Sequence, residues 1–125
     1  PRFAISRGKN ADNALIDYDL GDYQTFTLEG DIILTLVNWP QTYRFGKITV
    51  GIDLADGLTA GSVSFMTSEG GKFKKRYARS DADEYTGQFP DPLLIKPGEN
   101  HIVEFWTVDG GDTVFANYLG IFMDV

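Results

Sequence analysis

Apolar and polar side chains alternate along most of this chain, with every second residue on the same face. The alternation is clearest at residues 23–28 and 45–54, and a period of two is typical of an extended strand with one face buried. No segment carries the capped, 3.6-residue apolar stripe of a helix. The pattern predicts strands at residues 13–20, 23–28, 32–37, 45–54, 62–65, 73–77, 93–95, 100–108 and 113–123.

Eight or nine short strands with regular turn signals predict an all-β fold, an antiparallel two-sheet β-sandwich of jelly-roll type with little or no helix. Residues 1–12 are expected to form an N-terminal arm and residues 13–125 the β-sandwich domain. Glu29-Gly30-Asp31 and Asp109-Gly110-Gly111-Asp112 predict hairpin turns. A long loop is expected after the strand at 73–77, and such loops carry function or pack as Ω-loops.

Two of the expected strands, 32–37 and 113–123, are apolar on both faces. A sandwich strand needs only one apolar face. Either the chain's own loops cover the second face, or a neighbouring subunit does, and each side chain buried there contributes roughly 1.5–3 kcal/mol. The candidates for an intersubunit surface are Ile33, Val37 and Trp106.

Length and charge narrow the classes of partner. The 125 residues suit one domain, and the net charge of −7 disfavours duplex nucleic acid, whose phosphates require an excess of cations. No apolar run is long enough to span a membrane. The chain has no cysteine, which excludes disulfides and thiolate metal sites and agrees with assembly in a reducing cytoplasm.

Five of the eleven cations lie between residues 72 and 79, just before the acidic stretch 81–84. This cluster is either an electrostatic dock for an acidic neighbour, such as a shell protein or the 81–84 loop of another copy, or a charged edge strand that resists aggregation. The sequence leaves both interpretations open. The residues concerned are Lys72, Lys74, Lys75, Arg76 and Arg79.

Several aromatic residues could form a platform on which a sugar stacks. They are Trp39, Tyr43 and Tyr85, with Trp106 as a further member, and a glycan is the ligand that such a platform would bind. The alternative for Trp39, which precedes Pro40, is that it fills a corner of the fold.

Side chains suited to catalysis are few. His101 is the only histidine and, as an isolated residue in an expected strand, is interpreted as structural. Glu84, Asp91 and Glu104 could supply a glycosidase pair, but an acidic surface readily provides such pairs by chance. The acids at 81–84 and 109–112 do not match a full calcium-loop spacing. We therefore expect no enzyme activity, no cofactor and no metal.

The order of the motifs resembles a small all-β domain of bacteriophage tail-fibre and virion structural proteins. The resemblance is carried by residues 23–31, Asn38-Trp39-Pro40, 46–50, 53–57, 100–111 and 120–122, and it spans about 13–122. The chain departs from that family at 72–77, which replaces a Trp-Pro strand, and at 78–90, which is an apparent insertion.

The resemblance implies a non-enzymatic virion protein that is assembled in the host cytoplasm. In fibres the domain follows a long stalk region, and almost nothing precedes it here. That difference favours a capsid decoration or cement protein, with a tail-fibre receptor- or carbohydrate-binding module as the alternative. The expected partners are other virion proteins and further copies of the chain. A homotrimer is implied by the resemblance alone.

Overall fold

The computed structural model describes residues 4–9, 14–68 and 70–125. They form twelve strands and one short 3-10 helix, η1 (Tyr18–Leu20), so the prediction of an all-β chain is confirmed. The predicted bounds of three strands, at 23–28, 32–37 and 93–95, match the observed bounds. The strands are β1 (Ala4–Lys9), β2 (Leu15–Asp17), β3 (Tyr23–Leu28), β4 (Ile32–Val37), β5 (Gly46–Leu54), β6 (Gly61–Thr67), β7 (Lys72–Lys75), β8 (Tyr77–Arg79), β9 (Tyr85–Gly87), β10 (Leu93–Ile95), β11 (Asn100–Thr107) and β12 (Thr113–Phe122).

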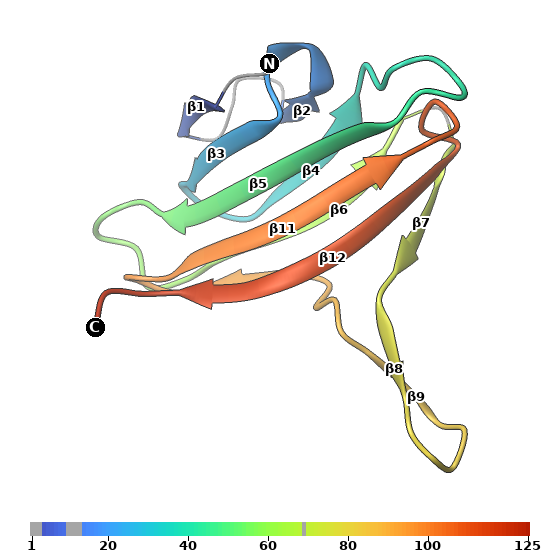
Figure 1. Ribbon diagram of the computed structural model, residues 1–125. Helices are drawn as coiled ribbons and strands as arrows, with labels where there is room; N and C mark the ends of the chain where they lie inside the picture. The colour runs from blue at the N-terminus through green and yellow to red at the C-terminus, as the bar shows by residue number, and fades with distance from the viewer. Residues whose placement is uncertain (1–3, 10–13, 69) are drawn as a thin grey trace.

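Ten of these strands form two sheets (Figure 1). Sheet A has the order β1-β3-β5-β11-β12-β7, and sheet B has the order β10-β6-β4-β2. The inward side chains of both sheets meet in one core, which includes Phe26, Val50 and Phe105 from sheet A and Leu34 and Val63 from sheet B. The alternation seen in the sequence thus directs one face of each sheet inward.

The pairing within the sheets is mixed, and the prediction of a purely antiparallel fold was wrong. From β1 to β6 the chain alternates between the sheets, and strands two apart pair in parallel: β1 with β3, β3 with β5, β2 with β4 and β4 with β6. Each connection crosses to the other sheet and reverses the chain, so strands two apart run in the same direction. Antiparallel pairing joins β5 to β11 and β11 to β12.

The two predicted hairpin turns have different outcomes. The prediction of a hairpin at 29–31 was wrong, because this turn joins β3 in sheet A to β4 in sheet B. Asp31 accepts a hydrogen bond from the backbone N–H of Ser62 there, at 3.0 Å, and so ties the crossover to β6. The turn at 109–112 does form the β11–β12 hairpin. Asp109 accepts from the N–H of Thr113 at 2.9 Å, and the N–H of Gly111 donates to Thr107 Oγ1 at 3.0 Å.

The N-terminal region also differs from the prediction. The strand expected at 13–20 is limited to β2 and is followed by η1, because Asp17 caps the helix by accepting from the N–H of Asp19 at 2.9 Å. Leu20, the last residue of the expected strand, is 40% exposed. Residues 4–9 of the expected N-terminal arm form β1, which pairs with β3 in sheet A. The rest of that arm, and residue 13, lie outside the described residues.

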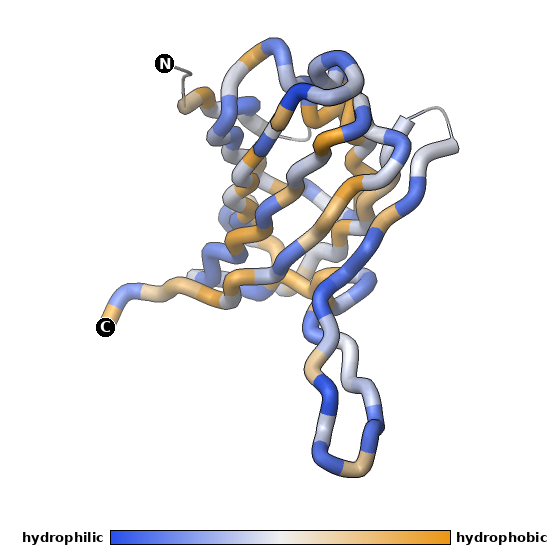
Figure 2. The backbone as a smooth tube through the Cα atoms, turned by 45° about the vertical axis from the view of Figure 1, so that its right-hand side comes forward, coloured by the Kyte–Doolittle hydropathy of each residue, from blue (hydrophilic) through white to orange (hydrophobic). Residues whose placement is uncertain are grey.

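Most of the expected long loop is a hairpin. The strand predicted at 73–77 ends at Lys75, and β8 and β9 then pair antiparallel. We call residues 76–88 the β8–β9 arm. It extends away from both sheets (Figure 1), and all of its residues are exposed. Most of its residues are hydrophilic (Figure 2).

Candidate interaction surfaces

The outer face of sheet B is uncharged across three neighbouring strands. Its larger apolar members are Ile33 on β4, Met66 on β6 and Leu94 on β10, which are 54%, 53% and 52% exposed. Small side chains separate them, because Ile33 lies opposite Ser64 and Leu94 opposite Ser62. We call this surface the B face. Its outward side chains are Ile33, Thr35, Val37, Ser62, Ser64, Met66 and Leu94.

The three predicted intersubunit residues have unequal exposure. Ile33 is the most exposed, and Val37 on the same face is half-buried. Trp106 is also half-buried, but it lies on the outer face of sheet A, where Phe115 stacks against it. On the outer face of sheet A, Trp106 and Phe115 therefore cover each other in part. On the outer face of sheet B, the surface around Ile33 stays open.

A row of cations and rings crosses the outer face of sheet A. The strand register aligns Lys47, Trp106, Phe115 and Lys74, on β5, β11, β12 and β7. The centroids of the two rings are 5.7 Å apart, and their planes differ by 12°. Beside the row is an open groove of about 380 Å³, which we call the aromatic groove. It is lined by Lys74, Lys75, Arg76, Trp106, Phe115, Ala116 and Asn117.

Polar contacts fix one side of this row. Lys47 Nζ lies 2.7 Å from Glu104 Oε2, and Asn117 Nδ2 donates to Glu104 Oε1 at 3.5 Å. Asn117 Oδ1 is buried and has no hydrogen-bond partner among the described residues. Within the described part of the chain, no carboxylate lies within ion-pair distance of Lys74 or Arg76. The groove therefore keeps two cations available.

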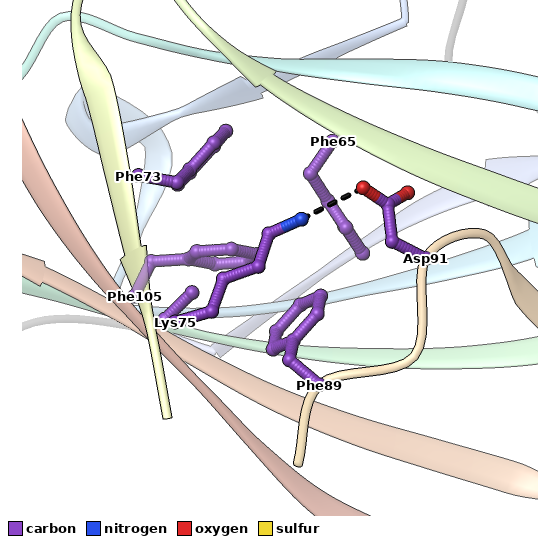
Figure 3. A pocket seen from close by; sticks show the side chains of 7 residues that line it. Phe65, Phe73, Lys75, Phe89, Asp91 and Phe105 are labelled. Carbon is purple, nitrogen blue, oxygen red and sulfur yellow. Dashed lines mark hydrogen bonds and ion pairs between the residues drawn. The ribbon is translucent and has the colours of Figure 1, made fainter. Parts of the chain in front are cut away.

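The five clustered cations do not all lie on one surface. The alternation of β7 separates Lys75 from Lys72 and Lys74, and Lys75 Nζ lies 2.7 Å from Asp91 Oδ2 and 5.5 Å from the centroid of the Phe89 ring (Figure 3). Arg79 lies on the β8–β9 arm, 3.9 Å from a carboxylate oxygen of Asp83.

Beneath Lys75, four phenylalanines fill the end of the core between the sheets (Figure 3). Phe105 is central, with ring centroids 4.9 Å from Phe65, 5.9 Å from Phe73 and 6.2 Å from Phe89. The hollow among them leaves no space for a water molecule. This packing closes the core, and we assign no ligand to it.

The structure does not bring all three predicted sugar-stacking residues together. Trp39 packs against Tyr18, with ring centroids 5.7 Å apart. Tyr43 is 95% exposed in the β4–β5 loop. Tyr85 lies on the β8–β9 arm, at the opposite end of the molecule from that loop (Figure 1). The two rings that lie side by side on an outer sheet face are instead Trp106 and Phe115, and Phe115 was not among the predicted residues. Counting outward from the 109–112 turn would have paired it with Trp106.

The single histidine lies in a buried polar chain. His101 is 3% exposed, and its ring nitrogens lie 2.9 Å from Glu99 Oε1 and 2.9 Å from the Tyr118 hydroxyl. The hydrogen bond to His101 lowers the pKa of the Glu99 carboxyl. Burial raises the pKa of Tyr118. The neutral ring can donate from Nε2 to Glu99 and accept at Nδ1 from Tyr118.

The carboxylates considered as a catalytic pair lie on different surfaces. Glu84 is in the turn of the β8–β9 arm, Asp91 pairs with Lys75, and Glu104 pairs with Lys47 on the outer face of sheet A. Among the residues that the structure describes, no three acidic or histidine side chains group as a metal ion would require. No helix in the described ranges is long and apolar enough to cross a membrane.

Comparison with protein-family models, curated proteins and solved structures found no match to this chain. The resemblance to phage virion domains therefore has no support beyond the motifs that carry it.

Proposed function

We propose that this chain is a non-enzymatic structural component of a phage virion, of the capsid decoration or cement type, and that it acts through protein–protein interfaces. The observation that carries the proposal is the uncharged B face. We place the chain in a virion because the order of its sequence motifs resembles that of phage virion domains.

An uncharged sheet face is unusual in this molecule. Charged residues make up 23% of the chain, and the net charge is −7, yet the seven outward side chains of β4, β6 and β10 include none. Two carboxylates border this face: Asp17 at the β2 edge lies opposite Val37, and Asp31 accepts a hydrogen bond from the backbone N–H of Ser62 at 3.0 Å. Depletion of charge is typical of the buried centre of a protein interface. Ile33, Met66 and Leu94 are about half exposed, so covering each of them would contribute roughly half of the 1.5–3 kcal/mol that full burial of such a side chain provides.

The B face would contact further copies of the chain, and a homotrimer is the assembly that the resemblance implies. The β8–β9 arm would contact other virion proteins, because a two-stranded hairpin has little stability of its own and gains order from a partner surface. The sandwich part of the predicted fold is supported by the core that both sheets share. The parallel pairs argue against the jelly-roll part of it.

The alternative is a tail-fibre module that binds a receptor or carbohydrate. Tyr85 lies on the β8–β9 arm, away from the loop that holds Trp39 and Tyr43, so the surface that best supports this alternative is a different one, the aromatic groove.

The assembly proposal predicts that Ile33→Asp weakens self-association, because a carboxylate would be buried without a partner at the contact. Sedimentation velocity should show a concentration-dependent oligomer for the natural chain and a monomer for Ile33→Asp. Val108→Asp is the matched control, because Val108 is 51% exposed and lies outside the B face. A monomeric natural chain at high concentration, or equal association of both variants, would contradict the proposal.

A further inference from the structure

The aromatic groove combines an apolar wall with unpaired cations. No side chain of the described residues neutralises Lys74 or Arg76, and Trp106 and Phe115 form the wall. We propose that this groove binds an acidic saccharide, whose sugar rings carry carboxylate groups. The inference is independent of self-association through the B face, because the groove lies on the outer face of sheet A; it shares Arg76 with the base of the β8–β9 arm.

The two rings offer surface to a flat apolar ligand. Their centroids are 5.7 Å apart, well beyond the carbon–carbon contact distance of about 3.5–4.0 Å. Nearly parallel rings at this separation overlap only in part, so each ring keeps some of its face uncovered. The C–H face of a pyranose ring is flat and apolar, and aromatic walls with a few fixed polar groups are typical of small-ligand sites.

The cations fit carboxylates. Lys74 lies next to Phe115 in the register, and Arg76 follows on the same side of the groove. Arginine can bind a carboxylate through two parallel hydrogen bonds, and lysine adds a point charge. Lys47 at the other end of the row is already paired with Glu104, so the attraction for an anion is concentrated beside Phe115.

Two other anions fit less well. A nucleic acid strand needs a continuous cationic track along its phosphates, and here the next row across the sheet carries Glu104. An acidic peptide has carboxylates but lacks the rigid C–H face that would cover both rings.

The test is a titration of the whole chain with tetragalacturonate and with its methyl ester, which keeps the sugar rings and removes the charge. The readout is the fluorescence of Trp106, recorded in a Trp39→Phe background and checked by calorimetry. We expect saturable binding of the acid form, with the ester bound at least about tenfold more weakly.

Variants then locate the site. Lys74→Gln with Arg76→Gln, and separately Phe115→Leu, should each weaken binding by about tenfold or more. Lys96→Gln should leave it unchanged, because Lys96 is an exposed cation in the β10–β11 turn that does not line the groove. Circular dichroism of each variant should match that of the natural chain.

Three results would overturn the inference. The first is an absence of saturation by tetragalacturonate. The second is binding that is indifferent to Lys74, Arg76 and Phe115. The third is equally tight binding of a tetra-aspartate peptide or of a thymidine oligonucleotide of matched charge. None of these results bears on self-association through the B face.

Discussion

At the scale of single residues, Glu99 links stability to pH. Its pKa is lowered, first by the hydrogen bond to His101 and then by the backbone N–H of Lys96. The folded state therefore binds this proton less tightly than the unfolded state. The stabilisation is present above the ordinary pKa of 4.5 and is lost as the pH falls through the lowered pKa.

Glu99→Gln removes that titration. We expect the free energy of unfolding of the natural chain to fall more steeply between about pH 5 and about pH 3 than that of Glu99→Gln. Urea denaturation across this range measures the difference. Asp109, whose pKa is also lowered by hydrogen bonds, chiefly from the Thr113 backbone, is present in both proteins. Parallel pH profiles would contradict the assignment of this stabilisation to Glu99.

Gly111 is a second residue with a local, testable role. Its φ is +94°, and a Cβ at this position would lie 2.5 Å from Trp39 Cδ1. Gly57, with a φ of +87° and nothing within 4 Å of its Cβ position, is the matched control. We expect Gly57→Ala to cost about 1–2 kcal/mol for the backbone alone, and Gly111→Ala about 1–3 kcal/mol more for the added crowding. Equal losses of unfolding free energy for the two variants, measured by urea denaturation, would mean that Trp39 moves aside from the added methyl group at no cost.

At the scale of elements, alternation located the strands well because burial of one face is a local property of the sequence. It could not show that residues 18–20 leave the strand, because that depends on the side chain of Asp17 capping η1. Nor did it identify Gln24, which is fully buried and donates to the backbone oxygens of Asp17 and Gly21 at 2.6 and 2.9 Å. Alternation shows only that position 24 carries a polar residue. The hydrogen-bond partners of Gln24 come from the tertiary structure.

The β8–β9 arm should be dispensable for folding. All of its residues are exposed, so replacing residues 77–87 with a short glycine-serine turn removes almost no buried apolar surface. We expect the free energy of unfolding to change by no more than about 0.5 kcal/mol, the usual range for surface changes. Urea denaturation tests this expectation.

A loss of several kcal/mol on this replacement would show instead that the arm supports the core. The neighbouring Lys75–Asp91 pair should be kept in the shortened chain, because Lys75 covers Phe89 at the end of the core.

At the scale of the whole molecule, the order of strands was beyond the reach of the sequence pattern. A period of two tells which face of a strand is buried, but not which strand lies beside it. The turn at 29–31 has the composition of a hairpin turn, yet it crosses from one sheet to the other. The crossing allows Leu28 of sheet A and Leu34 of sheet B to be buried in the shared core. The same winding places residues 62, 64 and 66 beside β4, and so creates the B face.

The two outer faces differ in charge, and this difference predicts opposite responses to salt. Between about 0.1 M and about 1 M NaCl the Debye length falls from about 10 Å to about 3 Å. Contact through the uncharged B face joins copies that each carry a charge of −7, so screening should leave self-association unchanged or strengthen it. Binding of an acidic saccharide beside Lys74 and Arg76 should weaken. Sedimentation and titration over one salt series measure both effects, and a shared direction would mean that the two activities use one surface.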